Sequence, residues 1–221
     1  FSRMSSTRLY GKALLYICGI PLLGRIIERA SMINNCKIVV ATSDSKDDLQ
    51  IVNYCKALGI NYFTGDLNNV MDRAVKCAKY YKFDRFARIC GDRPLFPYKM
   101  IESFLKIHRE QKLDLMTNNF PRTFPKGMTT EIISSKSLSK INKLSLNQYD
   151  REHITSFFYR KSKNFKIKLF QNNKDLSNYN FTVDTKEDLI RINWIYSQLN
   201  DIFDINLEEI TDLFNQWKKI K

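Results

Sequence analysis

Residues 37–65 have the sequence KIVVATSDSKDDLQIVNYCKALGINYFTG, and this stretch determines the fold class. Its first part, 37–42, is a continuous run of apolar and β-branched residues, as is typical of a buried parallel strand. A helix is expected over 47–58, and Gly59 stands at the position that commonly ends a helix. A second strand is expected over 60–63. Strand, helix and strand in this order predict a parallel pair joined by a right-handed crossover.

The same alternation continues along the rest of the chain. In the first half, further strands are expected at 85–89 and 114–117, and helices at 69–81 and 98–111. In the less regular second half, strands are expected at 131–134, 165–170 and 180–183, and helices at 150–160, 186–199 and 207–218. No internal repeat or low-complexity linker interrupts the pattern. We therefore expect one α/β domain over residues 1–221, built on a doubly wound sheet.

Composition restricts the class of protein. A hydrophobic fraction of 43% and an aromatic fraction of 13% exclude a disordered chain. The longest apolar stretch, 13–23, is broken by Gly19 and Pro21 and is too short to cross a bilayer. No signal peptide is visible. The five cysteines show neither metal-ligand nor CxxC spacing, which indicates buried thiols in a reducing compartment. We therefore expect a cytoplasmic protein.

The formal net charge of +13 has two interpretations. It suits a polyanionic partner such as nucleic acid, anionic lipid or a nucleoside triphosphate. The lysines are spread along the chain, however, and cluster only at 166–168 and 218–221, which favours a solvated basic surface. We therefore expect neither a nucleic-acid nor a membrane partner, and a basic nucleic-acid-binding module remains as an alternative.

Residues 3–12, RMSSTRLYGK, combine cations with small residues. Small residues let backbone N–H groups approach phosphate oxygens, and arginine and lysine neutralise the phosphate charge. The pattern GxxxxGK[ST] is absent, so this is not a Walker A loop. A phosphate-binding segment and a solvated basic terminus are both compatible with these residues.

Two aspartates follow expected strands. Asp92 lies in GDRP, and Asp184 lies in VDTKED. An aspartate at the carboxyl end of a parallel strand lies on the ligand-binding edge of such a sheet. The structural alternatives are a turn for Asp92 and a helix cap formed by Asp184 or Thr185.

Eight motifs in chain order carry a resemblance to a known family. Residues 3–14, RMSSTRLYGKAL, are similar to the signature RMGSTRLPGKVL. The resemblance continues through IPLLGRIIER (20–29), IVVATSD (38–44), NVMDR (69–73), ARICGDRPL (87–95), TNNFPRTFPKGMTTEI (117–132), REHIT (151–155) and TVDTKEDL (182–189). Over nearly its whole length the chain thus resembles the cytidylyltransferase family. It is most similar to the branch of spore coat polysaccharide biosynthesis protein F, which is related to the 3-deoxy-manno-octulosonate and acylneuraminate cytidylyltransferases.

The resemblance implies a Rossmann-like nucleotide-diphosphosugar transferase fold with a mixed central sheet flanked by helices. It implies an enzyme that transfers CMP from CTP to a sugar acid or a similar small anionic acceptor and releases pyrophosphate, in the synthesis of surface polysaccharide or glycan precursors. Mg²⁺ as cofactor and a homodimer are also implied. A glycosyltransferase of the same broad fold is an alternative, although the DxD motif is absent at 44–47 and 91–93. A non-catalytic relative is another.

The resemblance also implies roles for individual residues. Nucleotide binding is implied for Arg3, Ser5, Ser6, Arg8, Lys12, Thr42 and Arg73. Catalytic roles are implied for Arg3 and Lys12, which would hold the leaving pyrophosphate, and for Asp92 and Asp184, which would ligate Mg²⁺. Acceptor binding is implied for Arg122, Glu131, Arg151 and His153.

Two positions depart from the family signature. Ser5 stands where the signature has glycine, and Tyr10 stands where it has proline. We expect Tyr10 to loosen the loop, and Ser5 adds a Cβ that restricts the backbone. The strand expected ahead of Arg3 is not in the sequence. We therefore expect a trimmed chain whose phosphate segment lacks its anchor.

Overall fold

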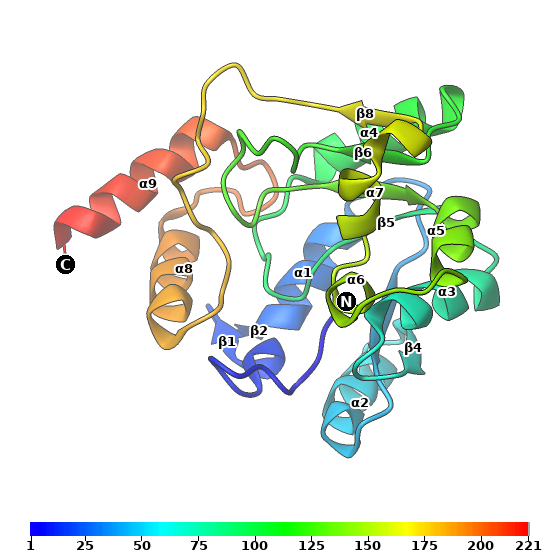
Figure 1. The fold of residues 1–221 in the computed structure, drawn as a ribbon. Helices are drawn as coiled ribbons and strands as arrows, with labels where there is room; N and C mark the ends of the chain where they lie inside the picture. Colours follow the sequence, from blue (N-terminus) through cyan, green and yellow to red (C-terminus); the bar gives the residue numbers. More distant parts are fainter. Residues whose placement is uncertain (221) are drawn as a thin grey trace.

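Strands and helices alternate along residues 1–220, the part of the chain that this computed structural model describes (Figure 1). The strands are β1 Tyr16–Ile17, β2 Ile20–Pro21, β3 Val39–Ser43, β4 Asn61–Gly65, β5 Arg85–Ala87, β6 Leu115–Thr117, β7 Glu131–Ser134 and β8 Ile167–Leu169. The α-helices are α1 Leu22–Ser31, α2 Leu49–Ala57, α3 Val70–Tyr80, α4 Tyr98–Glu110, α5 Ser135–Asn142, α6 Gln148–Glu152, α7 Ser156–Arg160, α8 Lys186–Gln198 and α9 Leu207–Ile220. Short 3₁₀ turns are η1 Lys12–Leu14, η2 Lys46–Asp48 and η3 Ser162–Asn164.

The strands form a parallel pair and a mixed four-stranded sheet. β3 and β4 pair in parallel, with Val39 opposite Asn61 and α2 between them in the chain, so the strand–helix–strand order and the parallel pairing expected from residues 37–65 are confirmed. In the larger sheet the order is β5-β7-β6-β8. β7 is antiparallel to β5 and β6, whereas β8 is parallel to β6. The expected mixed sheet flanked by helices is therefore confirmed.

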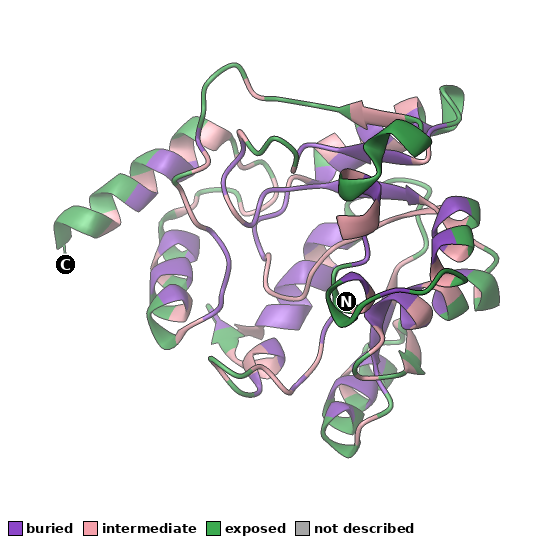
Figure 2. Cartoon of the chain, in the orientation of Figure 1, coloured by how far each residue is buried: buried purple, intermediate pink, exposed green. Residues whose placement is uncertain are grey.

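Helices cover both faces of the larger sheet. Successive residues of a strand point to opposite faces, so each strand contributes to two cores. Met116 and Ile132 pack with apolar residues of α1, α4, α8 and α9. Their neighbours Leu115 and Ile133 pack with α3, α5 and α7. The inner strands β6 and β7 are buried, whereas the edge strands β5 and β8 are less so, and Figure 2 shows that the outer faces of the flanking helices are exposed.

Phe1 and Ser2 lie between β3 and the continuation of β5. The amino group of Phe1 donates to the carbonyl of Ile89 (2.8 Å), and Gly91 N donates to Phe1 O (2.6 Å). On the other side, Ser2 N donates to the carbonyl of Ala41 (3.1 Å). Beside these residues lies a cavity of about 770 Å³, lined by the two strand segments and by α1, α3 and α4.

The strand expected at 180–183 is wrong. The segment is extended, but Asn180 forms only an isolated bridge with Lys126. Phe181 N donates to Lys126 O (2.7 Å), whereas Val183 N donates to Asp92 O (2.9 Å). Because the segment divides its hydrogen bonds between two neighbours, no continuous ladder forms.

The prediction of one continuous helix at 150–160 is also wrong. The segment is divided into α6 and α7, because His153 adopts φ −104° and ψ 81°, outside the helical region. α1 and α5 have no counterpart among the expected helices, although buried Leu22, Leu23, Ile26 and Ile27 give α1 a helical apolar pattern.

Within residues 1–220, no helix is long and apolar enough to span a membrane.

Candidate functional site

A buried carboxylate holds the start of the segment 3–12 against the end of β3. Met4 N donates to Asp48 Oδ1 (2.7 Å). The other oxygen, Oδ2, accepts hydrogen bonds from Thr42 Oγ1 and Ser43 N (both 2.9 Å). Thr42 is a candidate for nucleotide binding, but its hydroxyl already donates its hydrogen bond to Asp48 in the protein interior.

Lys12 joins this segment to both candidate metal ligands. Its Nζ lies 2.9 Å from Asp184 Oδ1 and 2.9 Å from the carbonyl of Val183. It also lies 3.9 Å from Asp92 Oδ2. Asp184 is 172 residues away in the sequence, so the fold brings together three of the predicted residues, Lys12, Asp92 and Asp184.

Asp184 faces three cationic side chains. Arg8 Nη2 lies 2.9 Å from Oδ1, which Lys12 also contacts, and Lys126 Nζ lies 3.1 Å from Oδ2. Burial by itself would raise the pKa of Asp184, but the ammonium groups of Lys12 and Lys126 outweigh it and hold the pKa well below its usual range. Even with Asp92 beside Lys12, two carboxylates face these three cations, so the cluster is suited to an anionic ligand.

Asp92 retains an unused oxygen beside this cluster. Its Oδ1 is buried, and none of the described residues hydrogen bonds to it. Arg93 Nε lies 3.8 Å from it, while Arg93 Nη1 donates to Thr129 Oγ1 (2.6 Å). A buried carboxylate oxygen without a hydrogen bond lowers the stability of the fold, which indicates that a ligand contacts this oxygen in the functional state.

The other candidates from the first segment lie near its start. Arg3 Nη2 is 3.1 Å from Glu152 Oε1, so the segment contacts α6. Ser5 and Ser6 are half-buried, and Ser6 N donates to Met4 O (2.7 Å). None of the bonds that the structure gives these serine residues joins them to Asp184.

Arg73 is buried on α3. Its Nη1 donates to the carbonyl of Asp66 (3.2 Å), and its Nε has no hydrogen-bond partner among the described residues. Burial and the nearby charge of Arg3 lower its pKa. This cation therefore lies near the start of segment 3–12 rather than on the exposed outer face of the helix.

Glu131 is buried in a polar network. Its Oε2 pairs with Arg88 Nη1 (2.9 Å), and its Oε1 accepts a hydrogen bond from the Tyr159 hydroxyl (2.6 Å). The Tyr159 ring is stacked on Phe120, with centroids 5.1 Å apart. Both oxygens of Glu131 are therefore engaged within the protein.

The remaining acceptor candidates lie apart from the cluster around Lys12. Arg122 is exposed and donates to the carbonyl of Ser177 (3.4 Å). Arg151 Nε donates to the carbonyl of Leu146 (3.3 Å). His153 is exposed, and its ring lies against Tyr149 at 4.4 Å. The structure thus gives these residues local contacts.

Three residues that complete the site are absent from the predicted set. Lys126 could have been noticed as a cation inside the motif 117–132. Arg93 directly follows Asp92 and could have been noticed for that reason. Asp48 has no local signal, because it is one of several acids at the start of an expected helix.

Comparison with known proteins identifies the family. A sequence profile described as cytidylyltransferase matches residues 1–220. The chain belongs to the cytidylyltransferase family. This cytidylyltransferase is 29% identical to a cytidylyltransferase from Leptospira borgpetersenii, whose structure superposes with a TM-score of 0.91 and covers 98% of this chain and 92% of the other.

Two further similarities accompany this match. It is 26% identical to spore coat polysaccharide biosynthesis protein SpsF of Bacillus subtilis, over 97% of this chain and 92% of the relative. It also shares its fold with CMP:2-keto-3-deoxy-manno-octonic acid synthetase, at 18% identity and a TM-score of 0.68, over 89% of this chain and 96% of the other. The cytidylyltransferase therefore has the Rossmann-like nucleotidyltransferase fold. Its family membership favours nucleotidyl transfer over the glycosyltransferase and nucleic-acid-binding alternatives.

Proposed function

We propose that the protein transfers CMP from CTP to a small anionic acceptor, such as a sugar acid, and releases pyrophosphate. The observation that carries this proposal is the cluster in which Arg8 and Lys12 of the N-terminal segment meet Asp92 and Asp184. Two relatives support it by name: one is involved in spore coat polysaccharide biosynthesis, and the other is a CMP–sugar acid synthetase complexed with CTP. We place the reaction in the synthesis of surface polysaccharide or glycan precursors.

The proposed chemistry is an in-line displacement at the α-phosphorus of CTP. The acceptor hydroxyl oxygen forms a bond to phosphorus and its proton passes to solvent. The bond to the bridging oxygen breaks, and pyrophosphate leaves with the electron pair. Fixed positive charge favours this departure, because it stabilises the negative charge that develops on the leaving group. Lys12 and Arg8, held by Asp184, would supply that charge, with Arg3 nearby at the start of the segment.

The residues fit a Mg²⁺ ion that is shared with phosphates. Within residues 1–220, no group of three or more His, Cys, Asp or Glu side chains is arranged to hold a metal ion. Asp92 and Asp184 both approach Lys12 Nζ. Asp92 Oδ1 is buried and accepts no hydrogen bond from the described residues. Mg²⁺ commonly takes one or two carboxylates and completes its shell with phosphate oxygens and water. Asp92 and Asp184 would hold the ion, which would neutralise phosphate charge when bound.

Nucleotide preference tests this proposal. We expect CTP with Mg²⁺ to raise the melting temperature more than ATP, GTP or UTP, since a ligand at one hundred times its Kd stabilises the folded state by about 2.7 kcal/mol. Pyrophosphate release should then require one member of a panel of sugar acids. Equal shifts with all four nucleotides would show mere polyanion binding and contradict the proposal.

A further inference from the structure

Lys126 is held rigidly against the segment that ends in Asp184. Its backbone N donates to the carbonyl of Tyr179 (2.9 Å), and its carbonyl accepts from Phe181 N (2.7 Å). The lysine therefore moves with residues 179–184, although it is 58 positions away from Asp184 in the sequence. These two hydrogen bonds restrict the backbone of Lys126.

Gly127 makes that close approach possible. Its φ is +96°, and a Cβ at this position would lie 2.8 Å from the carbonyl carbon of Phe181. Any side chain would push the two segments apart, because the contact is with backbone and cannot be relieved by a rotamer change. The chain thus uses a glycine to bring Lys126 against Asp184.

The contact with Asp184 leaves Lys126 with unused binding capacity. Its Nζ approaches Asp184 Oδ2 at 3.1 Å, while Lys12 and Arg8 already contact Oδ1. The Lys126 side chain remains 43% exposed and that of Arg8 61% exposed, so both can meet a ligand without a change of fold. The cluster contains two carboxylates, Asp92 and Asp184. Four cationic side chains lie within 4 Å of them, namely Arg8, Lys12, Arg93 and Lys126, so two positive charges are in excess.

We propose that Lys126 is a third cation of the triphosphate site, and that it binds phosphoryl oxygens of the nucleotide and of the released pyrophosphate together with Arg8 and Lys12. This inference rests on the proposed function. In it, Asp184 holds three cations in place before the nucleotide arrives; the phosphates then take over these cations, which leaves the carboxylate for Mg²⁺. An arrangement of this kind lowers the cost of assembling the site, because the side chains are ordered before binding.

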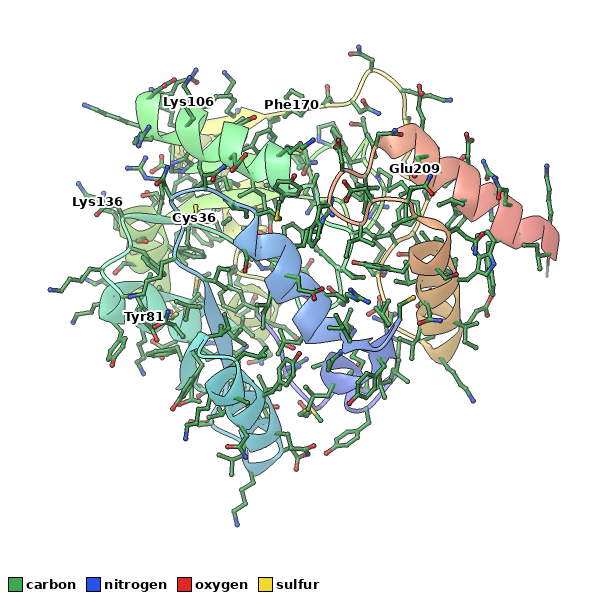
Figure 3. The ribbon with its side chains drawn as sticks, turned by 180° about the vertical axis from the view of Figure 1, so that it is seen from behind. Cys36, Tyr81, Lys106, Lys136, Phe170 and Glu209 are labelled. Atoms are coloured by element: carbon green, nitrogen blue, oxygen red, sulfur yellow. The ribbon has the colours of Figure 1, made fainter. Side chains whose placement is uncertain are left out.

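The test compares charge-removing and charge-retaining variants by calorimetric titration with CTP and with pyrophosphate, both in Mg²⁺. Lys126→Met should weaken both affinities about tenfold or more, since it removes a charge-assisted hydrogen bond. Lys126→Arg should stay within about threefold of the wild-type affinity. The matched control is Lys136→Met, an exposed lysine on α5 that is labelled in Figure 3 and should leave both affinities unchanged.

The outcomes separate this inference from the function on which it rests. If the wild-type protein binds neither CTP nor pyrophosphate, the proposed function is overturned. If the wild type binds and Lys126→Met binds equally well or more tightly, the inference alone is overturned, and Lys126 is only a counter-ion of Asp184. A lowered melting temperature with unchanged affinities would likewise assign Lys126 a purely structural role.

Discussion

At the scale of single residues, the structure decides between two interpretations of Asp184. Thr185 is the N-cap of α8: its side chain accepts from Asp188 N, and the Asp188 carboxylate accepts from Thr185 N. Asp184 precedes this capping box and turns its carboxylate to Lys12 and Lys126 instead. A helix-capping role therefore does not explain why an acid stands at position 184.

Replacing either aspartate by asparagine tests the site directly. We expect Asp92→Asn and Asp184→Asn each to lower turnover about 100-fold or more and to raise the Mg²⁺ requirement, because each removes an anionic ligand. The double variant should cost little more than the worse single one. Pyrophosphate release titrated with Mg²⁺ measures this, with the exposed Asp212→Asn on α9 as control. Wild-type rates in both single variants would remove the proposed metal site.

His108 is a residue outside the site whose protonation should affect stability. It is buried on α4, and burial, with the charge of Arg85, lowers its pKa to about 4. The unfolded chain has the ordinary value near 6.5 and therefore binds the proton more readily below that pH. Stability linked to His108 is thus fully present above pH 6.5 and is lost as the pH falls toward 4.

We therefore expect the wild type to lose on the order of 2–3 kcal/mol of unfolding free energy through His108 between pH 7.5 and pH 4.5. His108→Leu should lose less over the same interval, because leucine does not titrate. Urea unfolding of both proteins at the two pH values measures the difference. Identical pH dependence of the two proteins would show that His108 is not the titrating group.

At the scale of elements, β3 and β5 have incompletely used edges. Among the described residues, β3 pairs only with β4 and β5 only with β7, apart from the bonds to Phe1 and Ser2. The cavity between them is apolar on both sides, where Ile26 and Ile27 of α1 and Cys77 of α3 line it. Burial lowers the pKa of the Phe1 amino group to about 6, so the charged form is disfavoured there. Figure 3 labels two further lining residues, Cys36 and Lys106.

A variant with about five apolar, β-branched residues fused ahead of Phe1 should fill this cavity as a parallel strand, at 3.3 Å per residue. We expect its melting temperature to rise by about 5 °C or more, because apolar side chains fill the cavity and a peptide N–H replaces the buried amino group of Phe1. Fusing a Gly-Ser extension of equal length is the matched control, and acetylating Phe1 separates loss of the ionisable amino group from filling of the cavity. Equal melting temperatures for the two extensions would contradict this expectation.

At the scale of the whole molecule, the net charge is +13, and three of the cations, Arg8, Lys12 and Lys126, converge on Asp184. The many other lysines lie scattered on the surface, and a scattered charge binds polyanions weakly and through released counter-ions. We therefore expect binding to duplex or single-stranded nucleic acid to be weak at 50 mM salt and to vanish near physiological salt. Fluorescence anisotropy at both salt concentrations measures it. Salt-resistant, sequence-selective, nanomolar binding would contradict the proposed enzyme.

Helices and strands whose apolar pattern lies between near neighbours in the sequence could be predicted from the sequence. The parallel pair β3 and β4, the intervening α2 and the helices α3, α4, α8 and α9 follow from apolar periodicity between near neighbours. Gly59 follows the end of α2 with φ +66°, as its position predicts. The divided hydrogen bonds of 180–183 could not be predicted, because they depend on Lys126 and Asp92, which lie far away in the sequence.

The same distinction applies to the candidate site. The sequence by itself determined the family and the segments that carry charge, because its motifs occur in the same order as the signature of the family. Only the tertiary structure decided that Lys126 joins Lys12 at Asp184 and that Asp48 anchors Met4. These contacts link residues 44 to 172 positions apart. The energy of such a contact depends on burial and distance, which exist only after the chain has folded.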